Sequence, residues 1–522
     1  MMKNCILAGV GKADITAEPG AVIGELLTEK AKRHIPKELL GKRIEIDDPL
    51  FVKALVLDDG SSKVVLITMD VTAVGCRTTS QNILDDSADD FMANLRGRLL
   101  GELGIPPGNV SVCASHTHPP GRTLCSDEEQ LQRAFQAVEQ ALQSMTPVAV
   151  GSGSICDNRL TVNRTCRQKN GLHSCGRLPD EEVESLGPVD TEIGVIRIDR
   201  LDGSSLAVVY NFAAHILYSS PNDNISAGFP GIASDFLEKN LGGGMMAFFI
   251  QGAFGDVMEV GIAYNERVNP RSSCETGLML AQSVLAAYNE IKPSQASIQI
   301  VSTTVEFPLR EDIPDVLAAL RRQQESLIAA LDQLGLNFES FLPLYLQYAL
   351  HPKFPTHPAM RYLHSDQTGD PTVRGVDRRN RIAVEKYLHN VRSMEELSRN
   401  EFKRRTLQKH QEIIDTLGAK TVSAEIQGIK IGECALITAP MEVLTEVGFN
   451  VKKQSPFRHT YIASIANGYL HYSPPASYYP LGSYEATECL LNPKWEAIFY
   501  KVVQDIFAQL LVLKPIALEG GV

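Results

Sequence analysis

The chain has 522 residues, of which 44% are hydrophobic and 21% are charged, so it can bury a large core. Its formal net charge of -12 excludes a general nucleic-acid binder, because no basic field is available to neutralise phosphates. No apolar run approaches the ~18 to 20 residues that span a bilayer, and the N-terminus lacks the apolar core of a secretory signal. The sequence therefore predicts a cytoplasmic protein without a transmembrane segment.

Short apolar, β-rich runs alternate with helical patterns over the first 310 residues. Strands are expected at 50–57, 63–70, 109–114, 192–199, 206–213 and 245–250. Helices are expected at 88–104, 126–145, 231–241 and 274–292, and Ser126 is a suitable N-cap for the second of them. The β pattern returns at 422–430, 434–438 and 460–466, and a last helix is expected at 494–513. This alternation predicts an α/β body.

Residues 311–418 have a different sequence pattern, which is helical. Leucines fall at helical spacing and are expected to form a core: Leu317, Leu320, Leu327, Leu331 and Leu334. A second helical stretch, 376–417, is rich in charge and is typical of a solvated face. Between them lies a loop rich in proline, histidine and aromatic residues. The pattern predicts a helical insertion in the α/β body, and it leaves open whether residues 338–375 cover an active site.

The ten cysteines are dispersed and none form a C-x-x-C pair, which favours reduced and mostly buried thiols. Cys156, Cys166 and Cys175 lie near His173, but their spacings match no zinc module. These cysteines are therefore not expected to hold a metal.

The segment "SVCASHTHPPG" places His116 and His118 one residue apart, directly after an apolar run. Residues i and i+2 of a strand point to one face, so both side chains are expected to project together from the end of the strand 109–114. Neutral imidazole is a common zinc ligand, and catalytic zinc usually takes three protein ligands. The alternative is that the two histidines cap neighbouring backbone groups.

Three further residues stand where strands end. His215 follows an apolar strand, and Glu442 lies at a strand-to-helix corner, where a glutamate most often complements the helix dipole. Asp70 ends the run "VVLITMD" and could orient a zinc-bound histidine or cap the strand end. Taken one at a time, His215 and Glu442 are more typical of a structural role, whereas the two roles of Asp70 fit its position equally well.

Six motifs, taken in order, resemble the catalytic domain of the neutral/alkaline (non-lysosomal) ceramidase family. They are "GVGKADIT", "ASHTHPPG", "VNRT", "FAAHILYSSPNDNISAGFPGIASDFLE", "APMEVLTEVG" and "IANGYLHYSPPASYYPLGSYEA". The resemblance runs over nearly the whole chain and is poorest at 311–418. It implies one large α/β catalytic domain over residues 1–522, with mixed β-sheets flanked by helices and the helical insertion at 311–418. It also implies that the family's C-terminal immunoglobulin-like domain is missing.

The resemblance also implies roles for individual residues. The zinc ligands would be His116, His215, Glu442 and Tyr472, and the residues facing the substrate would be His118, Arg164 and Tyr484. Tyr469 competes with Tyr472 for the role of ligand. Met258 stands where the family has a serine in its active site, and a thioether neither donates a hydrogen bond nor acts as a nucleophile.

These residues predict a zinc-dependent amidohydrolase that cleaves an N-acyl bond in a small-molecule or lipid-like substrate. Met258 puts ceramide itself in question. Two alternatives stay open: a metal-dependent hydrolase, lyase or isomerase that acts on a polar, sugar-like metabolite, and a non-catalytic binding protein of the same fold. A homo-oligomer that assembles through the 311–418 helices is also compatible with the sequence.

Overall fold

The computed structural model describes residues 6–16, 18, 20, 22, 41–43, 45–75, 90–118, 125–175, 178–217, 224–260 and 272–512. The ends of two expected helices, at 88–89 and at 513, lie outside these residues, as do Cys5 and Cys76. The chain divides into two compact units, Glu311–Asp415 and the rest. Among the described residues, no helix has both the length and the apolar character that crossing a membrane requires.

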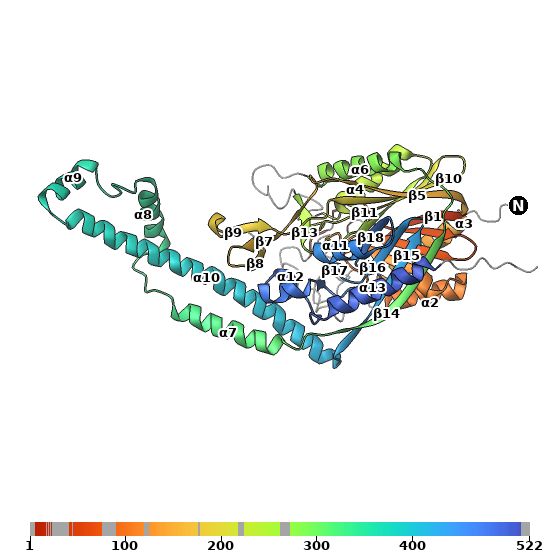
Figure 1. Ribbon diagram of the computed structural model, residues 1–522. Helices are drawn as coiled ribbons and strands as arrows, with labels where there is room; N and C mark the ends of the chain where they lie inside the picture. Colours follow the sequence, from red (N-terminus) through yellow and green to blue (C-terminus); the bar gives the residue numbers. More distant parts are fainter. Residues whose placement is uncertain are drawn as a thin grey trace, which may run out of the picture. The chain divides into compact units, whose positions relative to one another are not determined.

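An eight-stranded mixed sheet forms the centre of the larger unit (Figure 1). Its strands, in spatial order, are β12 (Met246–Gln251), β11 (Ser205–Phe212), β10 (Glu192–Arg200), β5 (Thr146–Cys156), β1 (Ile6–Asp14), β2 (Phe51–Asp58), β3 (Lys63–Met69) and β4 (Val110–Ala114). The β12–β11 and β3–β4 pairs are parallel and the others antiparallel. The expected strands in this half of the chain are all present, and β1 and β5 add to them.

Both faces of the large sheet are buried. Val52, Ala54 and Val56 of β2 pack with one helical layer, and the alternate residues Leu55 and Leu57 face the opposite side. The helices of that layer are α2 (Phe91–Leu103), α3 (Asp127–Gln143), α4 (Gly228–Leu241) and α6 (Ser273–Glu290). As expected, the Ser126 side chain caps α3, accepting a hydrogen bond from the backbone of Glu129.

A second sheet packs on the other face. It consists of β14 (Ile298–Pro308), β15 (Thr421–Ile431), β16 (Cys434–Ala439) and β18 (His459–Ser464). Its inner side chains, such as Ile429 and Leu436, share a core with Leu55 and Leu57. The helix α13 (Trp495–Leu511) contacts β14 and β15, and α11 (Thr445–Gln454) contacts α13. The larger unit is therefore built of four layers, helix–sheet–sheet–helix, and the predicted α/β class with mixed sheets flanked by helices is confirmed.

The glycines of "GVGKADIT" allow α3 to lie close against β1. A Cβ atom at Gly9 would collide with the backbone carbonyl of Ala141, and one at Gly11 with the carbonyl of Ala137. Both carbonyls belong to α3. Glycine is therefore required at these two positions by close packing of a strand on a helix.

Short strands beside the large sheet carry several residues of interest. They are β6 (Thr161–Asn163) paired with β13 (Val257–Glu259), β17 (Glu442–Val443) paired with β19 (Tyr472–Ser473), and a three-stranded sheet of β8 (His173–Cys175), β7 (Thr165–Gln168) and β9 (Val183–Leu186). The short helix α12 (Tyr484–Thr487) follows β19.

The smaller unit contains the helices α7 (Ile313–Ala329), α8 (Phe338–Leu350), α9 (Ala359–Thr368) and most of α10 (Thr372–Leu417). Leu320 of the predicted leucine stripe is buried against Leu407 of α10. The stripe ends earlier than expected, because α7 stops at Ala329; Leu334 lies beyond it and is 38% exposed. The segment expected to be a loop contains α9.

Candidate metal centre

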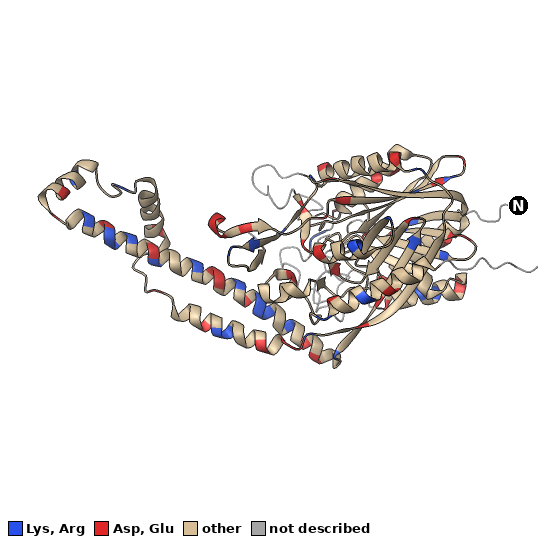
Figure 2. Ribbon diagram, in the orientation of Figure 1, with Lys and Arg blue, Asp and Glu red and all other residues tan. Residues whose placement is uncertain are grey.

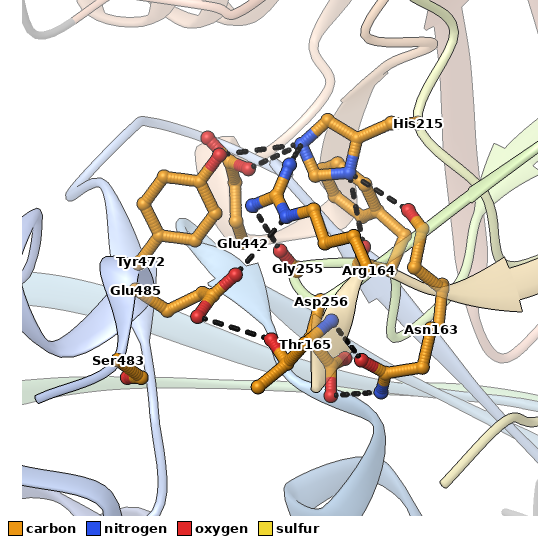
Figure 3. A network of polar contacts seen from close by, with 12 residues as sticks. Asn163, Arg164, Thr165, His215, Gly255, Asp256, Glu442, Tyr472, Ser483 and Glu485 are labelled. Atoms are coloured by element: carbon orange, nitrogen blue, oxygen red, sulfur yellow. Dashed lines mark hydrogen bonds and ion pairs between the residues drawn. The ribbon is translucent and has the colours of Figure 1, made fainter. Parts of the chain in front are cut away.

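Three buried residues bring potential metal ligands together. His116 follows β4, His215 follows β11 and Glu442 begins β17. One donor atom from each lies within 4.8 Å of the other two, and in the described part of the chain they are the one such group. The Glu442 Oε2 atom is 3.0 Å from His215 Nε2 and 3.8 Å from His116 Nε2 (Figure 3 shows Glu442 and His215). Three segments far apart in sequence thus converge on one point.

The two histidines of "SHTH" come together by a different route from the one expected. The strand β4 ends at Ala114, so His116 and His118 lie beyond it. His116 has a φ of 68°, in the left-handed region that a non-glycine residue adopts at an energetic cost. The two rings nevertheless lie 4.5 Å apart between centroids. An irregular segment with a left-handed residue, and not strand alternation, therefore places both imidazoles at the site.

Backbone carbonyls determine which ring nitrogens are protonated. His116 Nδ1 lies 2.8 Å from the Thr72 carbonyl, and His215 Nδ1 lies 2.9 Å from the Val257 carbonyl. Because a carbonyl only accepts hydrogen bonds, each Nδ1 carries the proton and each Nε2 presents a lone pair. Burial lowers the pKa of His116 to about 4 despite the nearby Glu442, so the neutral ring predominates near pH 7.

Glu442 supplies the negative charge of the group. Its Oε1 accepts a hydrogen bond of 2.6 Å from the Tyr469 hydroxyl, whereas Oε2 has no hydrogen-bond donor among the described residues. Burial acts to raise the pKa of Glu442, but His116, His215 and the Tyr469 hydroxyl together hold it below its usual value. Two imidazole lone pairs and a carboxylate oxygen therefore face one another with no proton between them, an arrangement that a bound cation would satisfy.

The two candidate tyrosine ligands have different positions. Tyr472 pairs with Glu442 across β17 and β19, and its hydroxyl lies 3.3 Å from His215 Nε2. Tyr469 donates to Glu442 instead. Burial raises the pKa of both phenols well above 10, so both are protonated here. The Tyr472 hydroxyl is beside a ligand nitrogen, whereas Tyr469 orients the carboxylate.

Arg164 lies beside the same group, with only 8% of its side chain exposed. Its Nε donates to Glu485 at 3.0 Å, its Nη2 donates to the Gly255 carbonyl at 2.7 Å, and its Nη1 is 3.5 Å from His215 Nε2 (Figure 3). The guanidinium also lies over the Tyr472 ring, 5.4 Å from its centroid. The Glu485 carboxylate and the Gly255 carbonyl thus hold the positively charged guanidinium of Arg164 next to the centre.

A buried aspartate joins the segments that carry these residues. Asp256 accepts hydrogen bonds from the backbone and hydroxyl of Thr445, at 2.9 and 2.7 Å, and from the Asn163 amide at 2.8 Å (Figure 3 draws the Asn163 bond). Asn163 precedes Arg164, and Thr445 begins the helix after Glu442. Burial raises the pKa of Asp256 to about 6.

Sequence reasoning missed Asp256 and Glu485 because their partners are distant in the chain. For Glu485, the available signal is its position directly after Tyr484. For Asp256, it is the neighbouring sequence "GDVM", which resembles the segment around the family's serine.

His118 and Tyr484 border the centre. The His118 ring centroid is 6.3 Å from that of His215, and its Nε2 has no hydrogen-bond partner among the described residues. Burial lowers the pKa of His118 well below 6.5. Tyr484 begins α12, and its ring lies 5.6 Å from that of Tyr472. Both side chains are therefore adjacent to the proposed ligands.

Asp70 and Met258 occupy different surroundings. Asp70 accepts a hydrogen bond of 2.9 Å from the backbone of Phe51, while the Nδ1 of His116 contacts the Thr72 carbonyl. These contacts fit the strand-end interpretation of Asp70. Met258 lies in β13 and pairs with His215 in a parallel bridge, so it is next to the centre in the backbone.

The fold and this group of residues define a four-layered α/β protein with a buried site suited to a cation. No family model matches the chain, and no curated protein matches it.

Solved structures do match. Neutral ceramidase from Pseudomonas aeruginosa aligns with a TM-score of 0.60 and 16% identity over 99% of this chain and 77% of that chain. A ceramidase complexed with C2 aligns with a TM-score of 0.60 and 15% identity over 97% and 75%, respectively. The chain therefore has the fold of neutral ceramidase, and the fold implied by the six sequence motifs is confirmed.

Proposed function

We propose that this protein is a zinc-dependent amidohydrolase of the neutral ceramidase family. One observation carries the proposal: the Nε2 atoms of His116 and His215 and the Oε2 atom of Glu442 converge as acceptors in a buried site, where Oε2 has no hydrogen-bond donor among the described residues. The fold shared with neutral ceramidase supports the same reaction class.

His116, His215 and Glu442 would hold the metal, with the Tyr472 hydroxyl as a fourth ligand. Nitrogen and carboxylate donors in a small buried site are typical of zinc. When bound, zinc would polarise the scissile carbonyl and lower the pKa of water towards ~7. The carbonyls of Thr72 and Val257 hold the two imidazoles in the orientation that this requires.

The neighbouring side chains would handle protons and charge. His118 is neutral and has a free Nε2, so it would accept a proton from the attacking water and return it to the leaving amine. Arg164 and Tyr484 would donate hydrogen bonds to the oxyanion that develops on the carbonyl. Glu485 and the Gly255 carbonyl keep the Arg164 side chain in place for this role.

Met258 bears on the choice of substrate. It stands beside His215 at the position where the ceramidase family has a serine, and it offers neither a hydroxyl nor an N–H group. We therefore propose an N-acyl substrate that is small or lipid-like and whose recognition does not depend on that serine. We expect Met258→Ser to raise the relative activity on ceramide, measured as the ratio of rates on ceramide and on a short N-acyl amide.

Metal analysis of the purified protein tests the proposal first. We expect about one zinc per chain, and we expect His116→Ala to lose both the zinc and the hydrolysis of N-acyl substrates. His389→Ala is the matched control, because this histidine lies on α10 and its ring contacts only a backbone carbonyl in the described structure. A fully zinc-loaded His116→Ala protein would contradict the ligand assignment.

Metal analysis and a set of N-acyl substrates also separate the alternatives. Activity on polar, sugar-like amides with none on lipid-like ones would favour the polar metabolite. A protein that binds no divalent metal would be a non-catalytic homologue.

A further inference from the structure

The helix α8 is apolar on two faces. Phe341 stacks on Tyr387 of α10, with ring centroids 4.1 Å apart, and both Phe341 and Tyr348 are buried. The Tyr348 hydroxyl donates to Asp377 at 2.9 Å. These contacts dock one face of α8 on α10 and account for its inward apolar residues.

A second face of α8 is apolar and exposed. Phe338, Leu342, Leu346 and Leu350 follow one another at four-residue spacing and are 63%, 40%, 48% and 71% exposed. Side chains at this spacing share one side of a helix. Met360 and Leu363 of α9 are also exposed, at 73% and 54%. We call the four exposed residues of α8 the outer apolar face.

This face is unusual for a protein surface. Residues 340–352 contain no Asp, Glu, Lys or Arg, and α8 is almost uncoloured by charge in Figure 2. A helix that is apolar all round is ordinarily buried, and large exposed apolar patches mark sites of association. The outer apolar face is therefore expected to be covered by something other than water.

Basic residues lie on the segments next to α8: Lys353 follows it, Arg361 is on α9, and Arg378 and Arg379 are on α10. Lys353, Arg361, Arg378 and Arg379 are exposed, and none of them forms an ion pair in the described part of the chain. We call these four residues the flanking bases.

Two of the nearby acidic groups are engaged locally. Asp366 pairs with Arg374 at 2.8 Å, and Asp377 is buried and accepts hydrogen bonds from Tyr348 and Thr356. Glu339, in the first turn of α8, is exposed and forms no ion pair in the described part of the chain, but the four flanking bases outnumber it. The net charge around the outer apolar face is therefore positive.

This charge distinguishes between two occupants. A second copy of the chain that packed symmetrically on the same face would bring the flanking bases of one copy against those of the other, which is unfavourable. An anionic lipid surface would accept the leucine and phenylalanine side chains at the level of its head groups and would pair with the bases. The helix is too short to span a bilayer and suits a position in the plane of the surface.

We propose that the outer apolar face, with the flanking bases, docks the protein on anionic lipid surfaces. The proposal goes beyond the proposed hydrolase activity and does not depend on the metal centre.

Co-sedimentation with vesicles tests it, using the full-length protein with vesicles of phosphatidylcholine alone or of phosphatidylcholine mixed with phosphatidylglycerol. We expect stronger binding to the mixed vesicles, and weaker binding as the salt concentration rises.

Two variants test the two parts of the surface. Leu346→Glu/Leu350→Glu should reduce binding to mixed vesicles by at least about tenfold, because two charges would enter the apolar layer. Arg378→Glu/Arg379→Glu should reduce binding by about fivefold or more for each base and should flatten the salt dependence. Both variants change exposed residues only. The matched control, Ile328→Glu/Met394→Glu, changes apolar residues that are 59% and 56% exposed but lie outside the face, and it should bind like the wild type.

Three outcomes would overturn the proposal: no binding to either vesicle, equal binding by the wild type and both variants, or a dimer in solution that Leu346→Glu/Leu350→Glu dissociates while vesicles go unbound. Zinc content and hydrolysis of a short, soluble N-acyl amide should be the same in all these variants. A failure of the hydrolase proposal would appear in those two measurements and not in the vesicle assay.

Discussion

The metal centre and the outer apolar face break the usual pattern of burial in opposite ways. At the centre, His116, His215 and Glu442 are each about 1% exposed, although their facing atoms are all hydrogen-bond acceptors. On α8, Phe338 and Leu350 are more than 60% exposed, although nothing in their chemistry favours water. Buried acceptors need a cation, and exposed apolar groups need an apolar partner.

This difference indicates which kind of ligand the metal centre and the outer apolar face each lack. The acceptors at the centre are held by carbonyls and a tyrosine in one arrangement, which suggests a small ligand of fixed geometry. The outer apolar face has no such polar framework. It consists of exposed apolar side chains with positive charge nearby, which suits a broad and fluid binding surface.

The largest effect is expected from removing the charge of the centre. Glu442→Gln keeps the shape of the side chain but removes the anion that balances a divalent cation. We expect loss of bound zinc and a fall of at least ~10³-fold in hydrolysis. Elemental analysis and initial rates check this outcome. Glu433→Gln, at an exposed glutamate, is the control. Undiminished zinc in Glu442→Gln would contradict the role of Glu442 as a metal ligand.

Removing the metal from the wild type should destabilise the larger unit. Without a cation, three acceptors face one another in a buried site, whereas bound zinc at about 1,000 times its Kd contributes about 4 kcal/mol to the free energy of unfolding. Thermal unfolding with and without a chelator measures this, and added zinc should restore the original Tm. Identical unfolding curves would show that no cation stabilises the site.

Asp256→Asn should separate positioning from metal binding. The asparagine cannot accept all three hydrogen bonds that the carboxylate accepts from Thr445 and Asn163. We expect zinc to be retained and hydrolysis to fall by about 10- to 100-fold. Asp157→Asn, at a buried carboxylate that Ser283 and Arg159 contact, is the matched control and should leave the rate unchanged. Equal rate losses in both variants would indicate a general effect on folding.

The two faces of α8 should respond differently to truncation. Phe341→Ala removes a buried ring from its stack on Tyr387 and should cost about 3 kcal/mol of stability in the smaller unit. Leu346→Ala, on the outer apolar face, should change stability by no more than about 0.5 kcal/mol. Hydrogen exchange of residues 311–415 measures both. A large cost for Leu346→Ala would mean that the outer face is already packed within the chain.

Asp70→Asn provides a smaller, pH-dependent test of a partly buried carboxylate away from the ligands. Burial raises the pKa of Asp70 from 3.8 to about 6, against the opposing effect of Lys53. The folded state therefore holds this proton more tightly than the unfolded state, and the free energy of unfolding of the wild type falls as the pH rises from about 4 to about 6.

Asparagine carries no charge and keeps an acceptor for the Phe51 amide. Relative to the wild type, Asp70→Asn should therefore gain stability over that pH range, by at most about 2 kcal/mol because the side chain is partly exposed. Denaturant unfolding at pH 4 and pH 8 measures the gain. A constant difference between the two proteins would contradict the raised pKa.

Much of the fold could be predicted from the sequence, and the exceptions have physical causes. The apolar runs that form β2, β3 and β11 are buried on both faces and are easily recognised. β14 was not predicted, because its sequence "IQIVSTTVEFP" mixes polar with apolar residues and it is a half-exposed edge strand. The leucine stripe was extended too far because spacing alone does not show where α7 ends.

The candidate site divides in the same way. The spacing of His116 and His118 could be read directly, and order along the chain linked them to His215 and Glu442. Glu485 and Asp256 act through partners that only the fold brings near: 321 residues separate Glu485 from Arg164, and 189 separate Asp256 from Thr445.

By itself, the sequence determined the α/β class, the helical texture of 311–418 and the residue types suited to a metal, because these depend on local periodicity and on side-chain chemistry. Only the tertiary structure decided which acceptors meet, which nitrogens of the histidines are free, and that one apolar face of α8 is packed on α10 while the other is exposed. These features arise from contacts between segments far apart in the chain, and no local pattern records them.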